Sequence, residues 1–293
     1  MSDDTPKLRM APGESTEELA RRVERENLSV TRQRENLLEQ ETLAPCRVGS
    51  VPYLNAVPLT RGLEDEIVFA PPALLAEKLR RNELDAALVS VTEVLLHDLY
   101  EVLDGVAVAS LGEVKSVFLA HRAPLGTLTE IFCDTASLTS VNLLKVLLAE
   151  RGLHPKFSPL DSYARAGSHE AVLLIGDRAI DFLRAPHTHE IWDLGAAWFE
   201  LTQLPFVYAV WALRRGLESR ELRRQLREAK AFGLDTLDSI ISSRTEFDLE
   251  FRKDYLGWHI HYHLGADEKR GLQKFIGLLR KHGLGPVYEP RFV

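Results

Sequence analysis

The stretch PALLAEKLRRNELDAALVS, residues 72–90, holds the two kinds of element that decide the fold. Over residues 72–82, apolar side chains recur close to the 3.6-residue period of a helix. These side chains are Leu74, Leu75, Ala76 and Leu79. Residues 84–90 form a short apolar run that predicts a buried strand. A helix that leads directly into a buried strand indicates an α/β protein.

The same alternation continues on both sides of this stretch. Further strands are predicted over residues 47–51, 105–111, 116–120, 131–133, 171–175 and 206–213. A helix over residues 141–151, which Gly152 ends, follows one of them. The last part of the chain is predicted to be helical, over residues 219–242, 247–264 and 267–282. Alternating strands and helices favour a mainly parallel sheet that helices cover on both faces.

Two extended runs, residues 106–118 and 206–213, are able to pass between two lobes. With two crossings, the first lobe is discontinuous and the second is continuous. The expected domains are residues 47–112 plus 207–293 for lobe 1, and residues 113–206 for lobe 2. This is the plan of the type II periplasmic-binding-protein fold, an α/β fold in which two lobes hold a ligand in the cleft between them.

Composition and charge exclude several classes of protein. Lys and Arg number 36 against 43 Asp and Glu, so the formal net charge of −7 argues against a nucleic-acid binder or docking on an anionic membrane. No apolar run approaches the ~20 residues of a membrane helix, and the start of the chain lacks the apolar core of a secretory signal. Two cysteines, Cys46 and Cys133, cannot form a disulfide framework and favour a cytoplasmic location. Residues 1–46 contain no aromatic residue, so we expect a polar extension that is partly helical or disordered.

Hydroxyl-bearing and small residues dominate the ends of the predicted strands, where ligands bind in open α/β sheets. The candidate substrate-binding residues are Tyr53, Ser90, Ser110, Ser116, Thr135, Ser137, Thr139, Ser140 and Gly176. The run from Asp134 to Ser140 precedes a helix, so its hydroxyls and helix amides suit a carboxylate or a phosphate. Simple N-capping explains the same residues, because Ser, Thr and Asp are the usual caps of any helix.

Other motifs are weaker. His259 and His263 would share the face of a helix, as metal ligands can, but no H-E-x-x-H pattern accompanies them. Cys133 lies in an apolar strand and fits a small core residue. The sequence contains neither a glycine-rich phosphate loop nor a G-x-S-x-G nucleophile elbow. No metal site is therefore expected.

Several blocks in a fixed order resemble one family. They are RVGSVPYLNAVPL at 47–59, NELD at 82–85, ALVS at 87–90, ASLGEVKSV at 109–117, DTASLTSV at 134–141, LLIGD at 173–177, DLG at 193–195 and LPFVYAVW at 204–211. Together they are similar to the chorismate dehydratases, the first enzymes of the futalosine route to menaquinone. The resemblance covers about residues 47–280. The sister dihydroxynaphthoate synthases typically open with a cysteine–proline–asparagine–aspartate-like stretch, which residues 52–55 do not match.

The resemblance implies a hydro-lyase that removes water from chorismate to give 3-[(1-carboxyvinyl)oxy]benzoate, with no metal or organic cofactor. Its partner is the small-molecule substrate, without nucleic acid or membrane, and a homodimer is left open. The expected catalytic residues are Asn55, which could orient the substrate or polarise the departing hydroxyl, and Asp177. For the base, Asp177, Glu93 and the substrate's own side-chain carboxylate stay open. The alternatives are a solute-binding protein for a small anion and the sister synthase.

Overall fold

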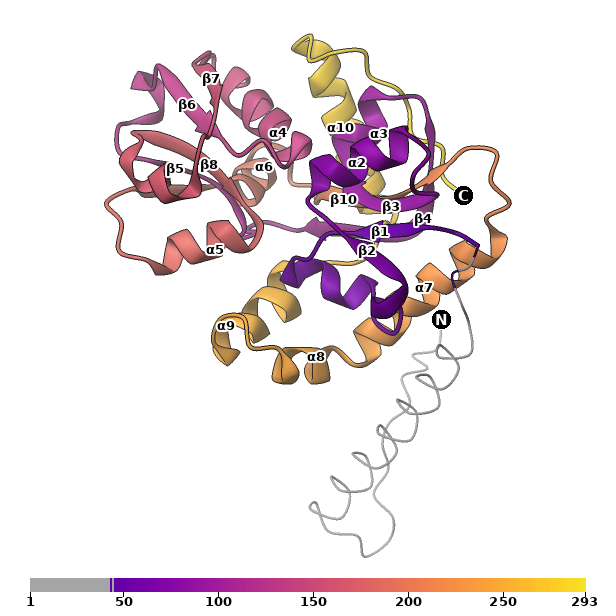
Figure 1. Ribbon diagram of the computed structural model, residues 1–293. Coiled ribbons are helices and arrows are strands. Elements are labelled where there is room, and N and C mark those ends of the chain that lie inside the picture. The colour runs from indigo at the N-terminus through magenta and orange to yellow at the C-terminus, as the bar shows by residue number, and fades with distance from the viewer. Residues whose placement is uncertain (1–42, 44) are drawn as a thin grey trace, which may run out of the picture. The chain divides into compact units, whose positions relative to one another are not determined.

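The computed structural model describes residues 43 and 45–293. The polar extension expected over residues 1–46 therefore lies almost entirely outside the described residues. The described chain contains two five-stranded sheets with helices packed on them (Figure 1). Within this part of the chain, none of the helices combines the length and apolar character that a membrane-spanning segment requires.

The first sheet has the strand order β2-β1-β3-β10-β4. Its strands are β1 (Val48–Ser50), β2 (Ile67–Phe69), β3 (Ala86–Ser90), β4 (Tyr100–Ser110) and β10 (Phe206–Arg214). Strand β1 is parallel to β2 and β3, and Val48 is in register with both Ile67 and Ala86. Strand β10 is antiparallel to its neighbours β3 and β4.

The second sheet has the order β7-β6-β8-β5-β9. Its strands are β5 (Val117–His121), β6 (Glu130–Cys133), β7 (Lys156–Pro159), β8 (Ala171–Ile175) and β9 (Glu190–Asp193). Strand β6 is parallel to β7 and β8, whereas β5 is antiparallel to β8 and β9.

Each sheet is thus mixed, and in each the reversed strand is the one that the chain enters from the other sheet. Residues 111–116 connect β4 to β5, and residues 203–205 lead into β10. A chain that crosses from the neighbouring sheet arrives where the other strands have their carboxyl ends. The strand that it forms must therefore run antiparallel to them. Residues 206–213, expected to cross between lobes, are strand β10 itself, and the crossing lies just before them.

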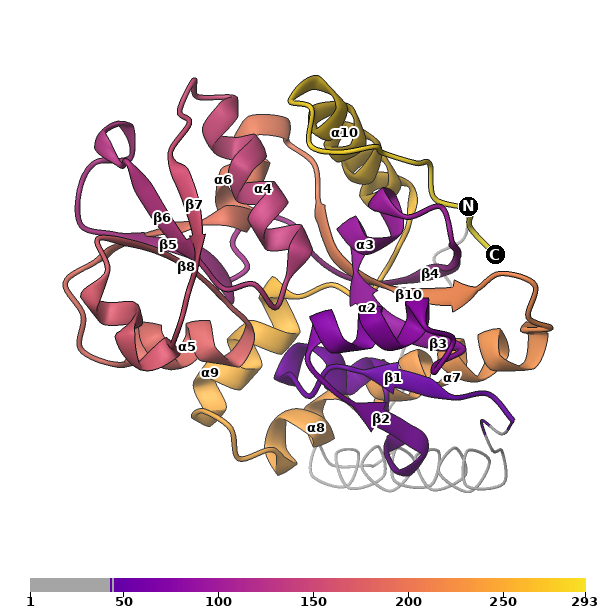
Figure 2. The ribbon, with the colours of Figure 1, turned by 45° about the horizontal axis from the view of Figure 1, so that its top comes forward.

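Helices cover both faces of the first sheet (Figures 1 and 2). On one face, α2 (Pro72–Arg80) contacts β1 and β3, α3 (Val91–Leu96) contacts β3 and β10, and α10 (Ala266–Lys281) contacts β10. Beneath the other face, α7 (Arg220–Asp235) contacts β4 and the 3₁₀-helix η1 (Leu54–Leu59), and α8 (Leu237–Ser243) also contacts η1. Further 3₁₀-helices are η2 (Glu64–Glu66), η3 (Leu125–Thr127) and η4 (Tyr163–Ser168).

Alternate side chains of β8 enter two different cores. Val172 and Leu174 belong to a small cluster with Ala179 of α5 (Gly176–Arg184), whereas Leu173 and Ile175 belong to the main core. The main core also holds residues of α4 (Leu138–Ala149) and α6 (Leu194–Thr202). A strand that is apolar on both sides must be covered on both sides. The continuous apolar run AVLLI of β8 therefore fits a strand sandwiched between helices.

The predicted helix over residues 247–264 is wrong in its second half. Helix α9 (Leu249–Asp254) passes into a π-helical turn, Tyr255–His259, and Ile260 is already extended. His261 then pairs with Ala109 of β4. His259 and His263 consequently do not share a helical face.

Candidate active site between the two sheets

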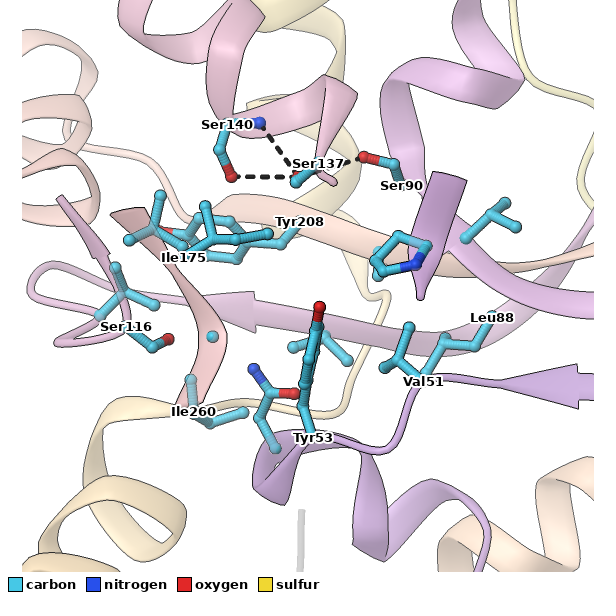
Figure 3. A pocket seen from close by; sticks show the side chains of 18 residues that line it. Val51, Tyr53, Leu88, Ser90, Ser116, Ser137, Ser140, Ile175, Tyr208 and Ile260 are labelled. Carbon is cyan, nitrogen blue, oxygen red and sulfur yellow. Dashed lines mark hydrogen bonds between the residues drawn. The ribbon is translucent and has the colours of Figure 1, made fainter. Parts of the chain in front are cut away.

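One pocket collects residues from both sheets at the ends of their strands (Figure 3). It is lined by Val51, Tyr53, Asn55, Pro72, Leu88, Val89, Ser90, Val108, Val114, Ser116, Val117, Ser137, Ser140, Ile175, Gly176, Tyr208, Ala209 and Ile260. We call it the central pocket. Its cavity volume is about 70 Å³, and a single water needs roughly 10–15 Å³ by this measure. The space suits a small molecule held between apolar walls and hydroxyl groups.

The start of α4 supplies one group of hydroxyls. Ser137 is the N-cap, and its Oγ accepts a hydrogen bond from the Ser140 amide at 3.3 Å. The two serine hydroxyls are 3.1 Å apart, and Ser90 Oγ of β3 lies 3.4 Å from Ser137 Oγ (Figure 3). A helix N-terminus carries a partial positive charge and favours an anion. Ser137 is both a cap and a lining residue, so the capping and the binding interpretations of this loop are compatible.

Thr139 and Ser140 differ in what they face. Thr139 is fully buried, and its Oγ1 accepts hydrogen bonds from Ser90 Oγ at 2.8 Å and from the Thr92 amide at 3.0 Å. Its own amide donates to Ser90 Oγ at 2.9 Å. The Thr139 hydroxyl thus ties α4 to the first sheet and does not line the pocket. Ser140 does line it.

Gly176 opens α5 on the opposite wall. Its φ of +58° lies in the left-handed region, which glycine adopts without strain. A Cβ atom at this position would lie 3.4 Å from the Tyr53 ring, so the glycine lets the ring lie against the helix start. The tyrosine side chain extends into the pocket (Figure 3). Burial, followed by the charges of Asp134 and Asp177, raises the pKa of Tyr53 to about 12, so its phenol stays protonated as a donor.

Asp177 lies beside the central pocket and not in its lining. Its carboxylate accepts long hydrogen bonds, 3.3 and 3.4 Å, from the Leu54 amide. The contact links α5 of the second sheet to the loop that carries Tyr53 and Asn55. Burial raises the pKa of Asp177 to about 6, against the lowering effect of the Leu54 amide.

Asn55 begins a chain of polar contacts that ends in the pocket. Its Nδ2 donates to the Tyr255 hydroxyl at 3.1 Å, and that hydroxyl donates to Ser116 Oγ at 2.8 Å. Burial raises the pKa of Tyr255 far above its usual range, so it keeps its proton. Because Ser116 accepts this bond, its own proton is directed to another acceptor. Asn55 and Ser116 both line the pocket.

Besides Thr139 and Asp177, two further predicted residues lie outside the lining. Ser110 is buried, and its Oγ donates to the Gly112 carbonyl at 3.1 Å and lies 3.0 Å from the Tyr208 hydroxyl. Thr135 is exposed. The structure therefore brings seven of the predicted residues together, namely Tyr53, Asn55, Ser90, Ser116, Ser137, Ser140 and Gly176.

The sequence did not reveal Tyr208, Tyr255 or Ile260 as parts of the site. Tyr208 sits inside an apolar strand, and nothing in that pattern separates a pocket tyrosine from a core tyrosine. Tyr255 occupies the π-helical turn, where the fold and not the local sequence directs the side chain inward.

Charged residues near the site have protein partners. Lys115 pairs with Asp254, and its amide donates to Asp193 at 2.8 Å. Glu93 accepts hydrogen bonds from Arg80 at 2.6 Å and Tyr100 at 3.0 Å. In the described part of the chain, the residues that line the pocket include no Lys, Arg, Asp or Glu. Hydroxyls, an amide side chain and helix amides are its polar groups.

Residues 43 and 45–293 contain no group of three or more His, Cys, Asp or Glu side chains that could hold a metal ion. His259 Nε2 lies 3.3 Å from Asp254 and its Nδ1 lies 2.9 Å from the Glu113 carbonyl. It belongs to the ionic contacts around Lys115.

Comparisons of the sequence point to one family. The profile described as menaquinone biosynthesis matches residues 46–281. A chorismate dehydratase from Thermus thermophilus is 35% identical over 274 residues, which is 85% of this chain and 99% of the relative.

Comparisons of the structure show the fold. A protein from Archaeoglobus fulgidus superposes with a TM-score of 0.66 at 23% identity, over 82% of this chain and 98% of that one. The ligand-binding component of an ABC-type import system from Staphylococcus aureus gives 0.60 at 13% identity, over 84% and 96%. The alkanesulfonate-binding protein of Xanthomonas axonopodis pv. citri gives 0.57 at 18% identity, over 84% and 96%. These likenesses confirm the predicted periplasmic-binding-protein-like α/β fold.

Proposed function

The chain belongs to the menaquinone-biosynthesis family, and on this premise we propose that it is a chorismate dehydratase. The reaction removes the hydrogen at C3 and the hydroxyl at C4 of chorismate, which gives 3-[(1-carboxyvinyl)oxy]benzoate and water. The observation that carries the proposal is the 35% identity to a chorismate dehydratase along nearly its whole length. The pocket between the sheets supplies the chemistry that this substrate requires.

The α4 start binds a carboxylate of chorismate. When the ring carboxylate is held there, Ser137, Ser140 and the helix amides surround it with donors. Charge flows onto this carboxylate through the ring diene as the C3 proton leaves, so donors fixed in place stabilise the transition state. Hydrogen bonds to charged groups contribute roughly 1.5–3 kcal/mol each. The apolar walls, among them Val51, Leu88 and Ile260, exclude water from the ring.

Asn55 and Ser116 act on the departing hydroxyl from the opposite wall. The Ser116 proton, which the contact with Tyr255 directs away from that tyrosine, stabilises the oxygen that leaves C4. Asn55 orients the hydrogen bonds that run through Tyr255 to Ser116, and the second N–H of its side-chain amide donates to the substrate. Aromatisation of the ring drives the step, so positioned donors suffice without a strong nucleophile.

We assign the proton acceptor to the substrate's own side-chain carboxylate. The described pocket lining has no carboxylate, and Glu93 is held by Arg80 and Tyr100. Asp177, whose pKa of about 6 suits a base, accepts from the Leu54 amide outside the lining. We propose that it positions the 53–55 loop. Tyr53, whose hydroxyl enters the pocket, donates to the substrate.

The expected lobe boundaries, at residues 47–112 with 207–293 and at 113–206, are part of the proposal. The strands of the two sheets support these ranges, with the single exception of Phe206, the first residue of β10, which falls one residue outside its range. The cytoplasmic location and the homodimer stay predictions. They are tested by cell fractionation and by light scattering of the purified protein.

Incubation of the purified protein with chorismate tests the function. We expect a product lighter than chorismate by one water, detected by mass spectrometry, with the ultraviolet spectrum of a substituted benzoate. A solute-binding protein would return chorismate unchanged after reversible binding. The sister synthase would leave chorismate untouched and bind it weakly.

A further inference from the structure

A second cavity lies behind the loop that carries Tyr53, and η1, β2 and α8 contribute residues to its lining. It is lined by Val51, Pro52, Tyr53, Val57, Thr60, Arg61, Glu64, Phe69, Ile240, Ser243 and Arg244. We call it the rear cavity. Its volume is about 440 Å³, much larger than that of the central pocket. Val51 and Tyr53 line both spaces, so the loop that carries them adjoins both.

The rear cavity differs from the central pocket in its charge. Arg61 and Arg244 line it from two elements far apart in sequence, together with one carboxylate, Glu64. Arg61 Nη1 lies 3.6 Å from Glu64 Oε1, a long ion pair. Arg244 pairs with Glu246 outside the lining. Two guanidinium groups on one cavity suit a carboxylate, because their planar N–H groups match its two oxygens.

The remaining wall is apolar and aromatic. Val57, Phe69 and Ile240 line it, and Phe69 is 43% exposed although it is large and apolar. The cavity thus presents two ion-paired guanidinium groups at one end and a surface on which a flat ring can lie. Ligand pockets commonly combine such apolar walls with a few polar groups that fix orientation.

We propose that the rear cavity binds a small aromatic carboxylate and that its occupation changes turnover in the central pocket. The carboxylate contacts Arg61 and Arg244, and the ring lies against Phe69 and Ile240. The binding goes beyond the proposed function and does not rest on it, since it is measured without turnover. The effect on turnover rests on the proposed function.

Two contacts join the rear cavity to the site. The occupant touches the back of residues 51–53, whose Tyr53 ring reaches into the central pocket. The charges of Glu246 and Arg244 also act on Asp177, the residue that holds the Leu54 amide. An anion beside Arg244 therefore changes the electrostatic environment of the loop and shifts its position. By linkage, binding at either space alters affinity at the other to the same extent.

Benzoate, as a minimal aromatic carboxylate, tests the binding by calorimetry. The variants are Arg244→Gln and Arg61→Gln/Arg244→Gln. The matched control is Arg81→Gln, which removes an exposed arginine paired with Glu77 on α2. Ser140→Ala serves as the control for the central pocket. Benzyl alcohol, which has the ring without the charge, controls for non-specific apolar binding.

We expect the wild type to bind benzoate but not benzyl alcohol. Arg244→Gln should weaken benzoate binding at least about tenfold, and Arg81→Gln and Ser140→Ala should leave it within about twofold. Because the Arg244 side chain is partly exposed, we expect Arg244→Gln to fold. It therefore decides the question if the double variant does not fold. Absence of benzoate binding, equal binding by Arg244→Gln and the wild type, or loss confined to Ser140→Ala would each overturn the proposal.

Turnover of chorismate tests the coupling. Benzoate should lower the rate of the wild type even at saturating chorismate, and Arg244→Gln should lose this effect. Inhibition that excess chorismate removes completely would place benzoate in the central pocket and refute the coupling. If the protein does not turn over chorismate at all, the calorimetric comparison still decides the site.

Discussion

Asn55 is the residue on which the proposed chemistry depends most. Its amide contacts Tyr255 at 3.1 Å and lines the central pocket. Asn55→Ala should lower kcat by about a hundredfold and change KM much less, because an interaction made mainly in the transition state affects kcat. Steady-state kinetics with chorismate measures this.

Tyr255→Phe is the matched control. It removes the hydroxyl between Asn55 and Ser116 and leaves both side chains in place. We expect a loss in kcat of less than about tenfold, smaller than that of Asn55→Ala. Wild-type turnover in Asn55→Ala would remove this residue from the catalytic account.

Thr139 and Ser140 are neighbours with different predicted effects. Thr139→Ala removes the acceptor of Ser90 Oγ and of the Thr92 amide in a buried place. It should lower the free energy of unfolding by roughly 1–3 kcal/mol and leave affinity unchanged in the folded protein. Ser140→Ala should weaken chorismate binding by about ten- to a hundredfold at nearly constant stability. Urea denaturation and calorimetry separate the two, and the reverse assignment of effects would contradict the geometry.

The raised pKa of Asp177 should make the stability of the protein depend on pH. Its pKa is raised from 3.8 to about 6 by burial, so the folded protein holds this proton more tightly than the unfolded chain. The free energy of unfolding therefore falls as pH rises from about 4 to 6. Asp177→Asn should lack this fall and be more stable than the wild type at pH 8 by roughly 1–3 kcal/mol. Turnover should stay within about threefold if the residue only positions the loop.

Urea denaturation at pH 4 and pH 8 measures this, with Asp181→Asn on the same helix as the control. A loss of kcat of a hundredfold or more in Asp177→Asn, with normal folding, would instead identify Asp177 as the base.

For single residues, the sequence predicted at which ends of the strands the polar side chains gather. It did not predict which of these side chains point into the central pocket. Ser90 ends β3 and Ser137 follows β6, and both line the pocket because the carboxyl ends of these strands meet there. Ser116 instead precedes β5, and it reaches the pocket because this strand is antiparallel to its neighbours. Whether Thr139 or Ser140 points inward depends on the rotation of α4 about its axis. That rotation is fixed by its packing on Ser90 and Thr92, which are distant in sequence.

Among the elements, the contact of α7 with η1 holds the Asn55 turn in place. A Cβ atom on Gly233 of α7 would lie 1.9 Å from the Pro58 carbonyl oxygen. Gly233→Ala must push the helix and the turn apart, and overpacking of this kind costs roughly 1–3 kcal/mol. We expect a lower melting temperature and a lower kcat in the folded fraction.

Gly277→Ala in α10 is the matched control, since nothing lies within 4 Å of its Cβ position. It should raise stability by up to about 1 kcal/mol through helix propensity alone. Equal melting temperatures for the two variants would show that the α7 contact is not tight.

Elements with a clear period were predictable, and those set by tertiary contacts were not. The apolar period of residues 72–82 correctly indicated α2. Residues 255–264 continue an apolar pattern, yet the helix ends at His259 because His261 pairs with Ala109 of the first sheet. A strand pairing of this range leaves no mark in the local sequence.

For the whole molecule, the two-sheet plan was predictable because β and α patterns alternate and then give way to helices. The mixed strand direction of each sheet was not predictable. It depends on which strand of a sheet the chain forms when it crosses from the other sheet. The pocket between the sheets also follows from the fold, because β1, β3 and β8 all end there. Its chemistry depends on the few side chains at those ends.

The measurement that tests the central claim most directly uses chorismate with deuterium at C3. We predict that the product is 3-[(1-carboxyvinyl)oxy]benzoate without deuterium, identified by NMR and mass spectrometry. The rate should be slower than with unlabelled chorismate when chemistry limits turnover. The deuterium should appear in the solvent, and Asn55→Ala should form the same product about a hundredfold more slowly. Recovery of unchanged labelled chorismate, or a product that retains deuterium at C3, would contradict the account.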